Sequence, residues 1–419
     1  MAETKTGLTV TDTKLLHSGL HPQDYQGATT VPIFMSSAFA HESAEELEAI
    51  FHNRKSGFAY SRIGNPTVND FERKMAFLEG GMSATACSSG SAAVALSLLT
   101  ILKSGDEILA PAGLYGGTLD LFRDLEAFEI STKYISPFTA ENVANHISDK
   151  TKVVFAEIIA NPGLDVVDVE EVAKAVHEKN LPFFVDATTV TPAVLKPISL
   201  GADVVIHSST KYINGNSNGI SGVIVDGASY NWDNEKFEVL GEYRKFKKAA
   251  FSSRLRNTIW RDIGGCLSPF QAFLNLEGLE TLGLRIRKAN DNALKLAKYF
   301  EGAPYIEEVN YPGLENHPDY ELVKRQFKDG AAGAILTIRL RSKERAYALL
   351  NALKIPLLAS NIGDVKTLVV HPASTIFAHS SLEEKEAAGV FDDLIRISVG
   401  IEDVDDLIGD FEAASKNLQ

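Results

Sequence analysis

The sequence predicts an α/β protein whose main sheet is mostly parallel and seven-stranded, with helices on both faces, followed by a smaller C-terminal α/β domain. Between residues 84 and 225, short apolar strands alternate with helical segments, which is the rhythm of βαβ units. The 419 residues suffice for about two to three domains. The apolar fraction of 45% and the charged fraction of 23% are those of an ordinary globular protein.

Taken in order, the chain is expected to begin with an irregular arm over residues 1–60, which has little core of its own. A helix should start at Asn65-Pro66, a turn signal with proline at the first helical position, and end at Gly80-Gly81. Strands are predicted at 84–87, 107–110, 132–135, 152–157, 183–186, 204–206 and 222–225. Helices near 91–103, 118–127, 140–148 and 168–179 separate most of them.

Residues 227–262 are polar, aromatic and irregular, and the domain boundary is placed there. The prediction is therefore an arm (1–60), a ligand-binding domain (61–262) and a C-terminal domain (263–419). Within the last, residues 267–300 should form a long helix with Gly278 and Gly283 as weak points. Strands are expected at 334–340 and 394–399, and helices at 343–353 and 404–414.

Composition excludes several classes of partner. A net charge of −14 argues against binding to nucleic acid or an acidic membrane, and the basic run at 244–248 is interpreted as a solvated helix face. Two cysteines and ten histidines show no metal-binding spacing, so no metal is expected. The amino terminus lacks the apolar core of a signal peptide, and no run has the length of a membrane span. A cytoplasmic protein is the expectation.

The stretch 203–222 organises the candidate site. An apolar strand ends in hydroxyl residues, and Lys211 follows them at a strand-to-loop bend, where open α/β sheets bind ligands. A partly desolvated amine there suits a Schiff base with a carbonyl compound. Two alternatives stay open. Lys211 can be an ordinary solvated charge, and residues 215–219 match the G-x-S-x-G elbow of serine hydrolases, with Ser217 as nucleophile.

Two further segments offer polar groups at strand ends. Residues 87–93, Cys-Ser-Ser-Gly-Ser-Ala-Ala, stand between the first strand and its helix, where small residues and free N–H groups favour an anion. The alternative is an ordinary capped helix. Asp186 ends the apolar strand 182–185, and a carboxylate there could hold a pyridine nitrogen protonated or could simply cap a helix.

Tyr115 and Arg396 complete the candidate set. Tyr115 follows a strand on a glycine-rich loop and could stack on a flat ligand, although a surface tyrosine is equally compatible. Arg396 is expected on the less buried face of its strand, where its guanidinium could bind an α-carboxylate bidentately or be half exposed. With hydroxyls at Ser208 and Thr210, these groups together supply the parts of a pyridoxal phosphate site.

The same stretches resemble the Cys/Met-metabolism family of pyridoxal-phosphate enzymes over nearly the whole chain. The matching motifs are Tyr60-Ser-Arg-Ile-Gly-Asn-Pro-Thr67, Ser89-Gly90, Tyr115-Gly-Gly117, Ser208-Ser-Thr-Lys211, His371-Pro-Ala-Ser-Thr375 and Arg396-Ile-Ser-Val-Gly-Ile-Glu-Asp403. The resemblance implies the fold type I of pyridoxal-phosphate transferases, with residues 61–262 as the cofactor-binding domain.

The resemblance also implies roles for individual residues. Lys211 would carry the cofactor and act in catalysis together with Tyr115, which stacks on the ring. The phosphate would be held by Gly90, Ser91, Ser208 and Thr210, together with Tyr60 and Arg62 from a neighbouring subunit. Asn161, Asp186 and Thr188 would contact the cofactor ring. Asn361 and Arg396 would bind the substrate. A homotetramer, built as a dimer of dimers, is the implied assembly.

Within the family the chain is most similar to O-acetylhomoserine sulfhydrylases, through Ala160-Asn-Pro-Gly163, Cys266-Leu-Ser-Pro-Phe270, Gly278-Leu-Glu-Thr281 and Ser360-Asn-Ile-Gly-Asp364. This implies γ-replacement on O-acetyl-L-homoserine by sulfide or a thiol. The alternatives are methionine γ-lyase and cystathionine γ-synthase or γ-lyase. Methionine γ-lyases usually have a cysteine at the position of Gly117, so the glycine counts against that activity. The chain departs from the family at Ala187, Thr189 and Asn214-Gly-Asn216, which concerns the substrate pocket.

Overall fold

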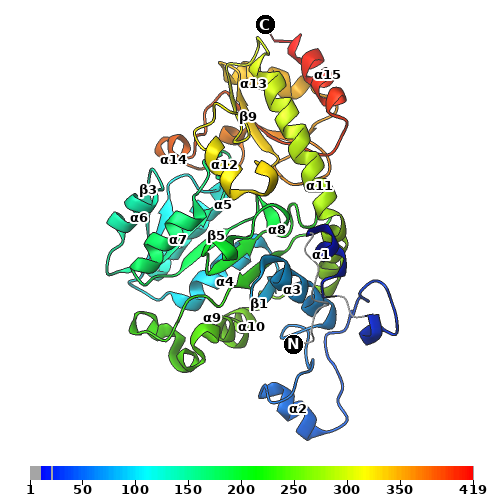
Figure 1. Cartoon of the computed structure of the whole chain (residues 1–419), viewed down its shortest axis with the longest axis vertical. Coiled ribbons are helices and arrows are strands. Elements are labelled where there is room, and N and C mark those ends of the chain that lie inside the picture. Colours follow the sequence, from blue (N-terminus) through cyan, green and yellow to red (C-terminus); the bar gives the residue numbers. More distant parts are fainter. Residues whose placement is uncertain (1–10, 20–21, 419) are drawn as a thin grey trace.

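The protein is described here by a computed structural model covering residues 11–19 and 22–418. Its larger part is a seven-stranded sheet in the order β1-β7-β6-β5-β4-β2-β3, in which only β7 runs antiparallel to its neighbours (Figure 1). The strands are β1 (Ser83–Cys87), β2 (Glu107–Pro111), β3 (Ser131–Ile135), β4 (Thr151–Glu157), β5 (Phe183–Asp186), β6 (Val204–His207) and β7 (Gly222–Asp226). All seven predicted strands and the mostly parallel sheet are thus confirmed.

Apolar side chains cover both faces of this sheet. Along β4, Val154 and Ala156 belong to one buried cluster, and Val153 and Phe155 to the other, because successive side chains of a strand point to opposite faces. Helices α3 (Pro66–Glu79), α7 (Val169–Glu178) and α11 (Pro269–Glu301) contribute to the first cluster, and α4 (Gly90–Ile101) and α5 (Gly116–Leu125) to the second. The short helices α6 (Ala140–His146) and α8 (Thr191–Val194) complete the crossovers.

The second sheet has five strands in the order β10-β11-β12-β9-β8. Its strands are β8 (Glu308–Asn310), β9 (Ile335–Arg339), β10 (Leu357–Leu358), β11 (Leu368–Val370) and β12 (Leu394–Ser398), and its helices are α12 (Tyr320–Gln326), α13 (Lys343–Ala352), α14 (Leu382–Ala387) and α15 (Val404–Ser415). The sequence predicted β9 and β12 but neither β8, β10 nor β11. Strands of two or three residues are too short to show an alternating pattern.

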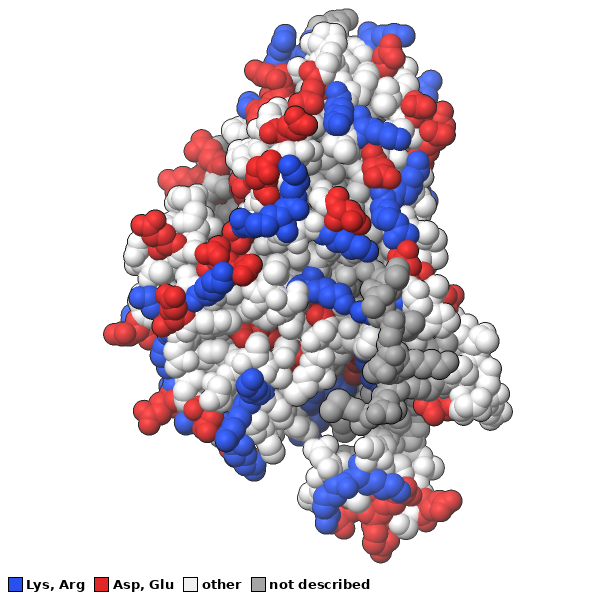
Figure 2. All heavy atoms as spheres, viewed as in Figure 1, with Lys and Arg blue, Asp and Glu red and all other residues white. Residues whose placement is uncertain are grey.

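The segment 227–262 is more ordered than its sequence indicates. It forms broken 3₁₀ turns at Glu235–Ala249, helix α9 (Ala250–Arg254), one π-helical turn (Leu255–Ile259) and α10 (Trp260–Ile263). Most of its aromatic residues, including Trp232 and Trp260, are buried against the large sheet, whereas Phe246 is exposed. The basic run 244–248 is mostly exposed, as expected, but it lies on 3₁₀ turns interrupted at Lys247, so it is no continuous helix face. Elsewhere acidic and basic side chains are interspersed (Figure 2).

The arm is also less irregular than predicted. Helix α1 (Thr11–His17) packs on α11, where Leu15 is only 1% exposed, so the body of the same chain holds this segment of the arm. A 3₁₀ turn (Pro22–Tyr25) and α2 (Ala44–Phe51) follow, and α2 lies away from the body at the lower end of the molecule (Figure 1). Within the described ranges, no helix is both long and apolar enough to cross a membrane.

Helix α11 joins the two sheets without a break at its two glycines. A Cβ at Gly278 would lie 2.3 Å from the carbonyl oxygen of Ile213, so glycine lets the helix approach the loop that follows Lys211. From the next turn, Arg285 donates to the carbonyl oxygen of Tyr212 over 2.8 Å. These contacts fix the loop against the helix.

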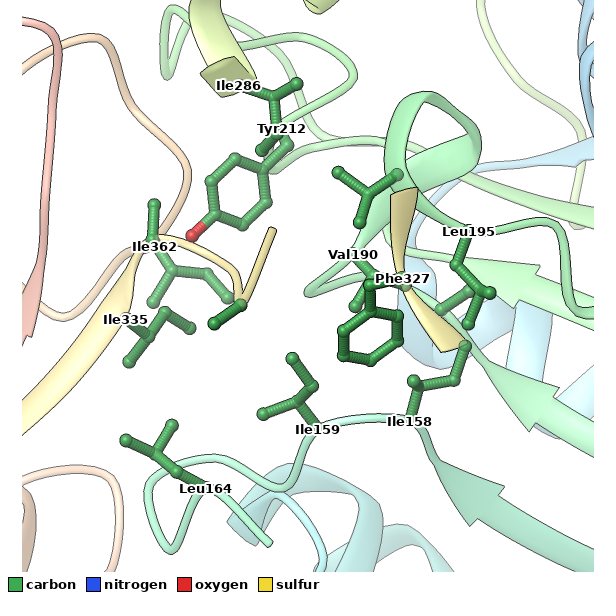
Figure 3. Packing of buried hydrophobic residues seen from close by; sticks show 14 of the residues in the cluster. Ile158, Ile159, Leu164, Val190, Leu195, Tyr212, Ile286, Phe327, Ile335 and Ile362 are labelled. Carbon is green, nitrogen blue, oxygen red and sulfur yellow. The ribbon is translucent and has the colours of Figure 1, made fainter. Parts of the chain in front are cut away.

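Buried apolar side chains fill the space between the two domains (Figure 3). Ile159 and Tyr212 come from the large domain, and Ile335 and Ile362 from the small one. Because Ile362 also lines a cavity that Asp186 and Lys211 line from the large domain, this contact region ends at the candidate site.

Candidate active site

The candidate site lies at the carboxyl ends of the central strands. Asp186 is the last residue of β5 and Lys211 follows β6 by four residues; the two strands are parallel neighbours, so their ends meet at one edge of the sheet. A cavity of about 280 Å³ opens there. It is lined by most of the predicted residues, namely Gly90, Ser91, Tyr115, Asn161, Asp186, Thr188, Ser208, Thr210, Lys211 and Arg396.

Lys211 points its amine toward the small domain. Its Nζ donates a hydrogen bond to Oδ1 of Asn361, and its backbone N–H bonds to the carbonyl oxygen of Ser208 in a tight turn. Burial, and then the nearby guanidinium of Arg396, lower the pKa of Lys211 to about 8. The lysine is therefore not the solvated charge of the alternative interpretation, and its amine is partly neutral near physiological pH.

Arg396 is 2% exposed, so the sequence-based alternative of a half-exposed strand arginine is wrong. Both faces of β12 are covered, one by the small-domain core and the other by the large domain. The guanidinium of Arg396 donates through Nη1 to Asn161 Oδ1 over 3.2 Å and through Nη2 to the carbonyl oxygen of Asn361 over 2.9 Å. Burial lowers its pKa to about 10. Its Nε is buried without a hydrogen-bond partner, which leaves a donor for an anionic ligand.

One end of the cavity is suited to an anion. Ser89 caps α4, its side chain accepting from the N–H of Ala92, and the N–H groups at a helix start have no intrahelical partner. A Cβ at Gly90 would lie 2.6 Å from Cβ of Ser208, so only glycine lets the helix start approach the end of β6 this closely. The Thr210 hydroxyl also lines the cavity, but it is engaged with the backbone of Ser221.

Asp186 and Thr188 form a linked pair at the other end. The N–H of Thr188 donates to Asp186 Oδ1 over 2.8 Å, and its hydroxyl accepts from the N–H of Ser208 over 2.8 Å, which ties β5 to β6. Burial raises the pKa of Asp186. Of the departures from the family pattern, Ala187 is fully buried, and the Thr189 hydroxyl donates to the carbonyl oxygen of Ile159 over 3.4 Å. Both fit without disturbing Asp186.

The structure adds Glu157, which the sequence reasoning missed. It ends β4 beside Asp186 in the strand register, and its Oε1 accepts from the backbone N–H of Tyr115 over 2.9 Å. Tyr115 begins α5 without a side-chain cap, so this carboxylate holds the start of the helix. Burial, and then repulsion by Asp186, raise the pKa of Glu157 well above its ordinary value. Its place at the end of an apolar strand, like that of Asp186, was the signal available in the sequence.

Tyr115 is 39% exposed, with its ring at the cavity. A Cβ at Gly117 would lie 2.6 Å from the Tyr115 ring, so a cysteine at that position would displace the ring. The Tyr115 ring can therefore take its observed position only because residue 117 has no side chain.

Three predicted residues do not line the cavity. Asn361 stands beside it and contacts Lys211, whereas Tyr60 and Arg62 lie elsewhere. Tyr60 is 42% exposed, and Arg62 lies over the Tyr60 ring and donates to the carbonyl oxygen of Arg261 over 2.7 Å. Arg62 thus contacts α10, and neither residue lines the cavity of its own chain.

The hydrolase interpretation of Ser217 is contradicted. A nucleophile elbow needs a helix directly after the serine, whereas Ser217 lies in a loop that leads into β7. Its hydroxyl accepts from Asn361 Nδ2 over 2.8 Å. Among the described residues, no group of three or more His, Cys, Asp or Glu side chains could hold a metal ion.

The cavity fits pyridoxal phosphate. It presents neutral anion-binding groups at the α4 start, a carboxylate at the β5 end, an aromatic ring, a near-neutral amine, and a guanidinium with an unpaired donor. These match, in turn, the cofactor's phosphate, ring nitrogen, ring face and aldehyde, and a substrate carboxylate.

Comparison with known proteins agrees with this class of enzyme. A model of the Cys/Met metabolism PLP-dependent enzyme family matches residues 12–416, so the chain belongs to that family. Its cofactor is pyridoxal phosphate. A solved Campylobacter jejuni protein described as an O-acetylhomoserine (thiol)-lyase, which carries a pyridoxyl-phosphate-modified lysine, superposes with a TM-score of 0.93 at 31% identity, covering 97% of this chain and 100% of its own.

Curated relatives carry two kinds of name. A sulfhydrylase of Fusarium oxysporum is 41% identical over 96% of both chains, and the O-acetyl-L-homoserine sulfhydrylase of Leptospira meyeri is 36% identical over 97% of both. The L-methionine gamma-lyase of Fusobacterium nucleatum is 37% identical over 97% of this chain and 98% of its own. Identity alone therefore does not separate replacement from elimination.

We expect Glu157→Ala to weaken pyridoxal phosphate binding about tenfold, because the Tyr115 N–H and the start of α5 lose their acceptor. Glu157→Gln keeps an oxygen at that position and should stay within about threefold of the parent protein. Spectroscopic titration of the apoprotein gives the dissociation constants, and circular dichroism of the bound cofactor reports the ring position. Equal losses in the two variants would show that the charge, and not the contact, is what matters.

The depressed pKa of Lys211 predicts how the apoprotein takes up its cofactor. Below its pKa the amine is protonated and cannot attack an aldehyde, so the rate of covalent uptake should rise with pH through about 8, well below the ordinary lysine value. Because Arg396 contributes to the depression, Arg396→Leu should move the midpoint upward. Stopped-flow absorbance against pH measures both, and a midpoint near 10 in the parent protein would contradict the assignment.

Proposed function

We propose that this protein catalyses γ-replacement on O-acetyl-L-homoserine, with sulfide or a thiol as the incoming nucleophile, giving homocysteine or methionine and acetate. The observation that carries the chemistry is the pairing of Lys211 with Arg396 in one cavity: a near-neutral amine stands beside a guanidinium that has an unpaired donor. The sulfhydrylase names among the relatives, and Gly117, support replacement over elimination.

The proposed roles of the chain's residues follow from the contacts described above. Arg396 binds the substrate carboxylate through its guanidinium, and Asn361, which bonds to both Lys211 and Arg396, contacts the same substrate in this proposal. Lys211 Nζ, once free, removes the proton from Cα, gives that proton up to the bound cofactor, and in its neutral form then removes a proton from Cβ. Bound pyridoxal phosphate supplies an electron sink for the charge that these transfers leave behind.

The remaining groups hold and orient the cofactor. Asp186 keeps the ring nitrogen protonated by ion pairing, Tyr115 stacks on the ring, and Thr188 and Asn161 contact its edge. The phosphate is held by the backbone of Gly90 and Ser91 with the hydroxyls of Ser208 and Thr210.

A neighbouring subunit is part of the proposal. Lys211 and Arg396 are the basic residues among those described at the cavity, and both have other proposed roles, so the phosphate end of one chain has only neutral donors. Tyr60 and Arg62, exposed near an arm whose Met35 and Phe51 are 71% and 56% exposed, would complete that end from the partner. The proposed assembly is a homotetramer made of two such dimers, and the proposed location, from composition, is the cytoplasm.

The decisive assay supplies O-acetyl-L-homoserine with and without sulfide. We expect homocysteine and acetate to form with sulfide, and little 2-oxobutyrate to form without it. Lys211→Ala should lower turnover by at least about 10³-fold, because both the covalent link and the general base are lost. Lys103→Ala, at an exposed ion pair with Glu238, is the control and should leave turnover unchanged. Release of 2-oxobutyrate at the same rate in both conditions would assign the protein to the γ-lyases.

Sharing of the site between subunits predicts complementation. Arg62→Ala and Lys211→Ala should each be nearly inactive as purified homo-oligomers, because each lacks a group in every site. Mixed and reassembled, they form hybrid dimers in which one of the two sites has both groups, so activity should recover to about a quarter of the parent value after random mixing. No recovery despite verified subunit exchange would place Arg62 outside the partner's site.

A further inference from the structure

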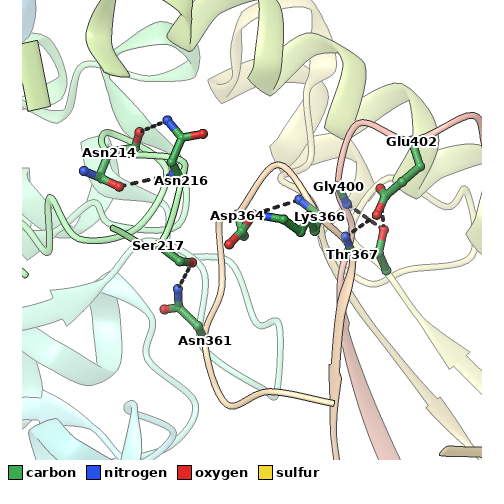
Figure 4. Close-up of polar contacts among 9 residues, drawn as sticks. All are labelled: Asn214, Asn216, Ser217, Asn361, Asp364, Lys366, Thr367, Gly400 and Glu402. Atoms are coloured by element: carbon green, nitrogen blue, oxygen red, sulfur yellow. Dashed lines mark hydrogen bonds and ion pairs between the residues drawn. The ribbon is translucent and has the colours of Figure 1, made fainter. Parts of the chain in front are cut away.

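The loop that follows Lys211 meets the small domain at a polar contact. Ser217, from the loop between β6 and β7, accepts a hydrogen bond from Nδ2 of Asn361, which lies between β10 and β11 (Figure 4). Their neighbours Ile220, Ser360 and Ile362 line the cavity. The contact therefore joins the two domains beside the candidate active site.

The backbone of this loop holds Ser217 in an unfavourable conformation. Its φ of 53° lies in the left-handed region, where glycine is preferred. Contacts within the loop set its conformation: Asn214 Oδ1 accepts a hydrogen bond from the N–H of Asn216 over 3.1 Å, and Gly215 has a φ of 77°. These asparagines belong to the segment that departs from the family's usual Gly-Gly-His. At this position, which favours glycine, the serine brings a hydroxyl that contacts Asn361 and Asp364.

Asn361 occupies a junction between the proposed reacting groups. Its side-chain oxygen accepts from Lys211 Nζ, and its backbone oxygen accepts from Nη2 of Arg396 over 2.9 Å. A carboxamide has one donating end and one accepting end. With the donating end held by Ser217, the accepting end must face Lys211, whose protonated amine can only donate.

The charged groups around this contact are consistent with a fixed orientation. Arg396 is the charged side chain that acts on Lys211 from the small domain. On the far side of Ser217, burial would raise the pKa of Asp364, but hydrogen bonds from the Ser217 hydroxyl and from Lys366 lower it below its ordinary value. The Ser217 hydroxyl thus lies between an amide donor and a carboxylate acceptor, which leaves it little freedom to rotate.

We propose that Ser217 is a positioning residue that fixes the Asn361 carboxamide, so that its oxygen faces Lys211 and the small-domain loop at 359–367 stays docked on the large domain. This inference rests on the proposed function for the identification of Lys211 as the reacting amine. Ser217 touches neither cofactor nor substrate in this account; it acts through Asn361. The departure at residues 214–216, directly before Ser217, is thereby assigned to substrate positioning.

The test compares Ser217→Ala with Asn218→Ala, a neighbouring exposed loop residue, as matched control. The first readout needs no substrate. In the Ser217→Ala apoprotein the acceptor for the Lys211 ammonium is no longer fixed, so the pH midpoint of covalent pyridoxal phosphate uptake should fall by about half a unit. The second readout is kinetic: KM for O-acetyl-L-homoserine should rise about 3- to 10-fold with kcat within about twofold, because docking of the substrate loop is weakened.

Two more variants keep the result interpretable. Ser217→Gly removes the hydroxyl but suits the left-handed backbone, so it should reproduce both shifts even where Ser217→Ala folds poorly. Asn361→Asp keeps an oxygen for Lys211 but cannot donate to Ser217. A Ser217→Gly protein that matches the parent and Asn218→Ala in both readouts would overturn the proposal. If the parent does not turn over O-acetyl-L-homoserine at all, the proposed function fails, and the uptake midpoint still decides the role of Ser217.

Discussion

The structure depends on burying an amine and a guanidinium in one cavity. Lys211 and Arg396 come from different domains, and each loses hydration there; together they would repel one another without intervening acceptors. Asn361 supplies those acceptors, giving its side-chain oxygen to Lys211 and its backbone oxygen to Arg396. The desolvation that this arrangement costs is also what brings the Lys211 amine toward neutrality, so the same constraint that strains the apoprotein prepares it for covalent chemistry.

Apolar residues between the domains and helix α11 support the walls of that cavity. Apolar residues between the domains, such as Ile159 and Ile362, exclude water next to the cavity, and α11 fixes the loop after Lys211. Gly278 allows the approach of that helix, and Arg285 bonds to the loop's carbonyl oxygens. Without these contacts the segment carrying Lys211 would have the freedom of an ordinary surface loop.

The groups that the sequence revealed are those whose position follows from a strand. Asp186 and Lys211 were predictable because apolar strands of a parallel sheet end at one edge, and Gly90 because a small-residue turn precedes a helix. Glu157 was missed although it ends β4 in the same manner, since nothing in the sequence shows that its carboxylate reaches the N–H of Tyr115. The contact of Asn361 with Lys211 spans 150 positions along the chain and depends on how two domains pack, which no local pattern records. For Tyr60 and Arg62, one chain does not show a partner's site, and only the family resemblance indicated it.

The two kinds of site residue therefore differ in how easily they can change. Asp186 ends β5, and Ser208 and Lys211 lie in the turn directly after the neighbouring strand β6, so the register of these two strands holds the proposed cofactor residues close together. Arg396 and Asn361 reach the cavity from a second sheet, across contacts made by side chains and loops. A substitution in those loops can shift the substrate groups relative to the amine without moving the cofactor groups. The departure at Asn216 lies on the other side of this contact, in the β6–β7 loop of the large domain, next to Ser217, which accepts from Asn361. A change in that loop can therefore also shift the proposed substrate groups while the proposed cofactor groups at the strand ends stay in place.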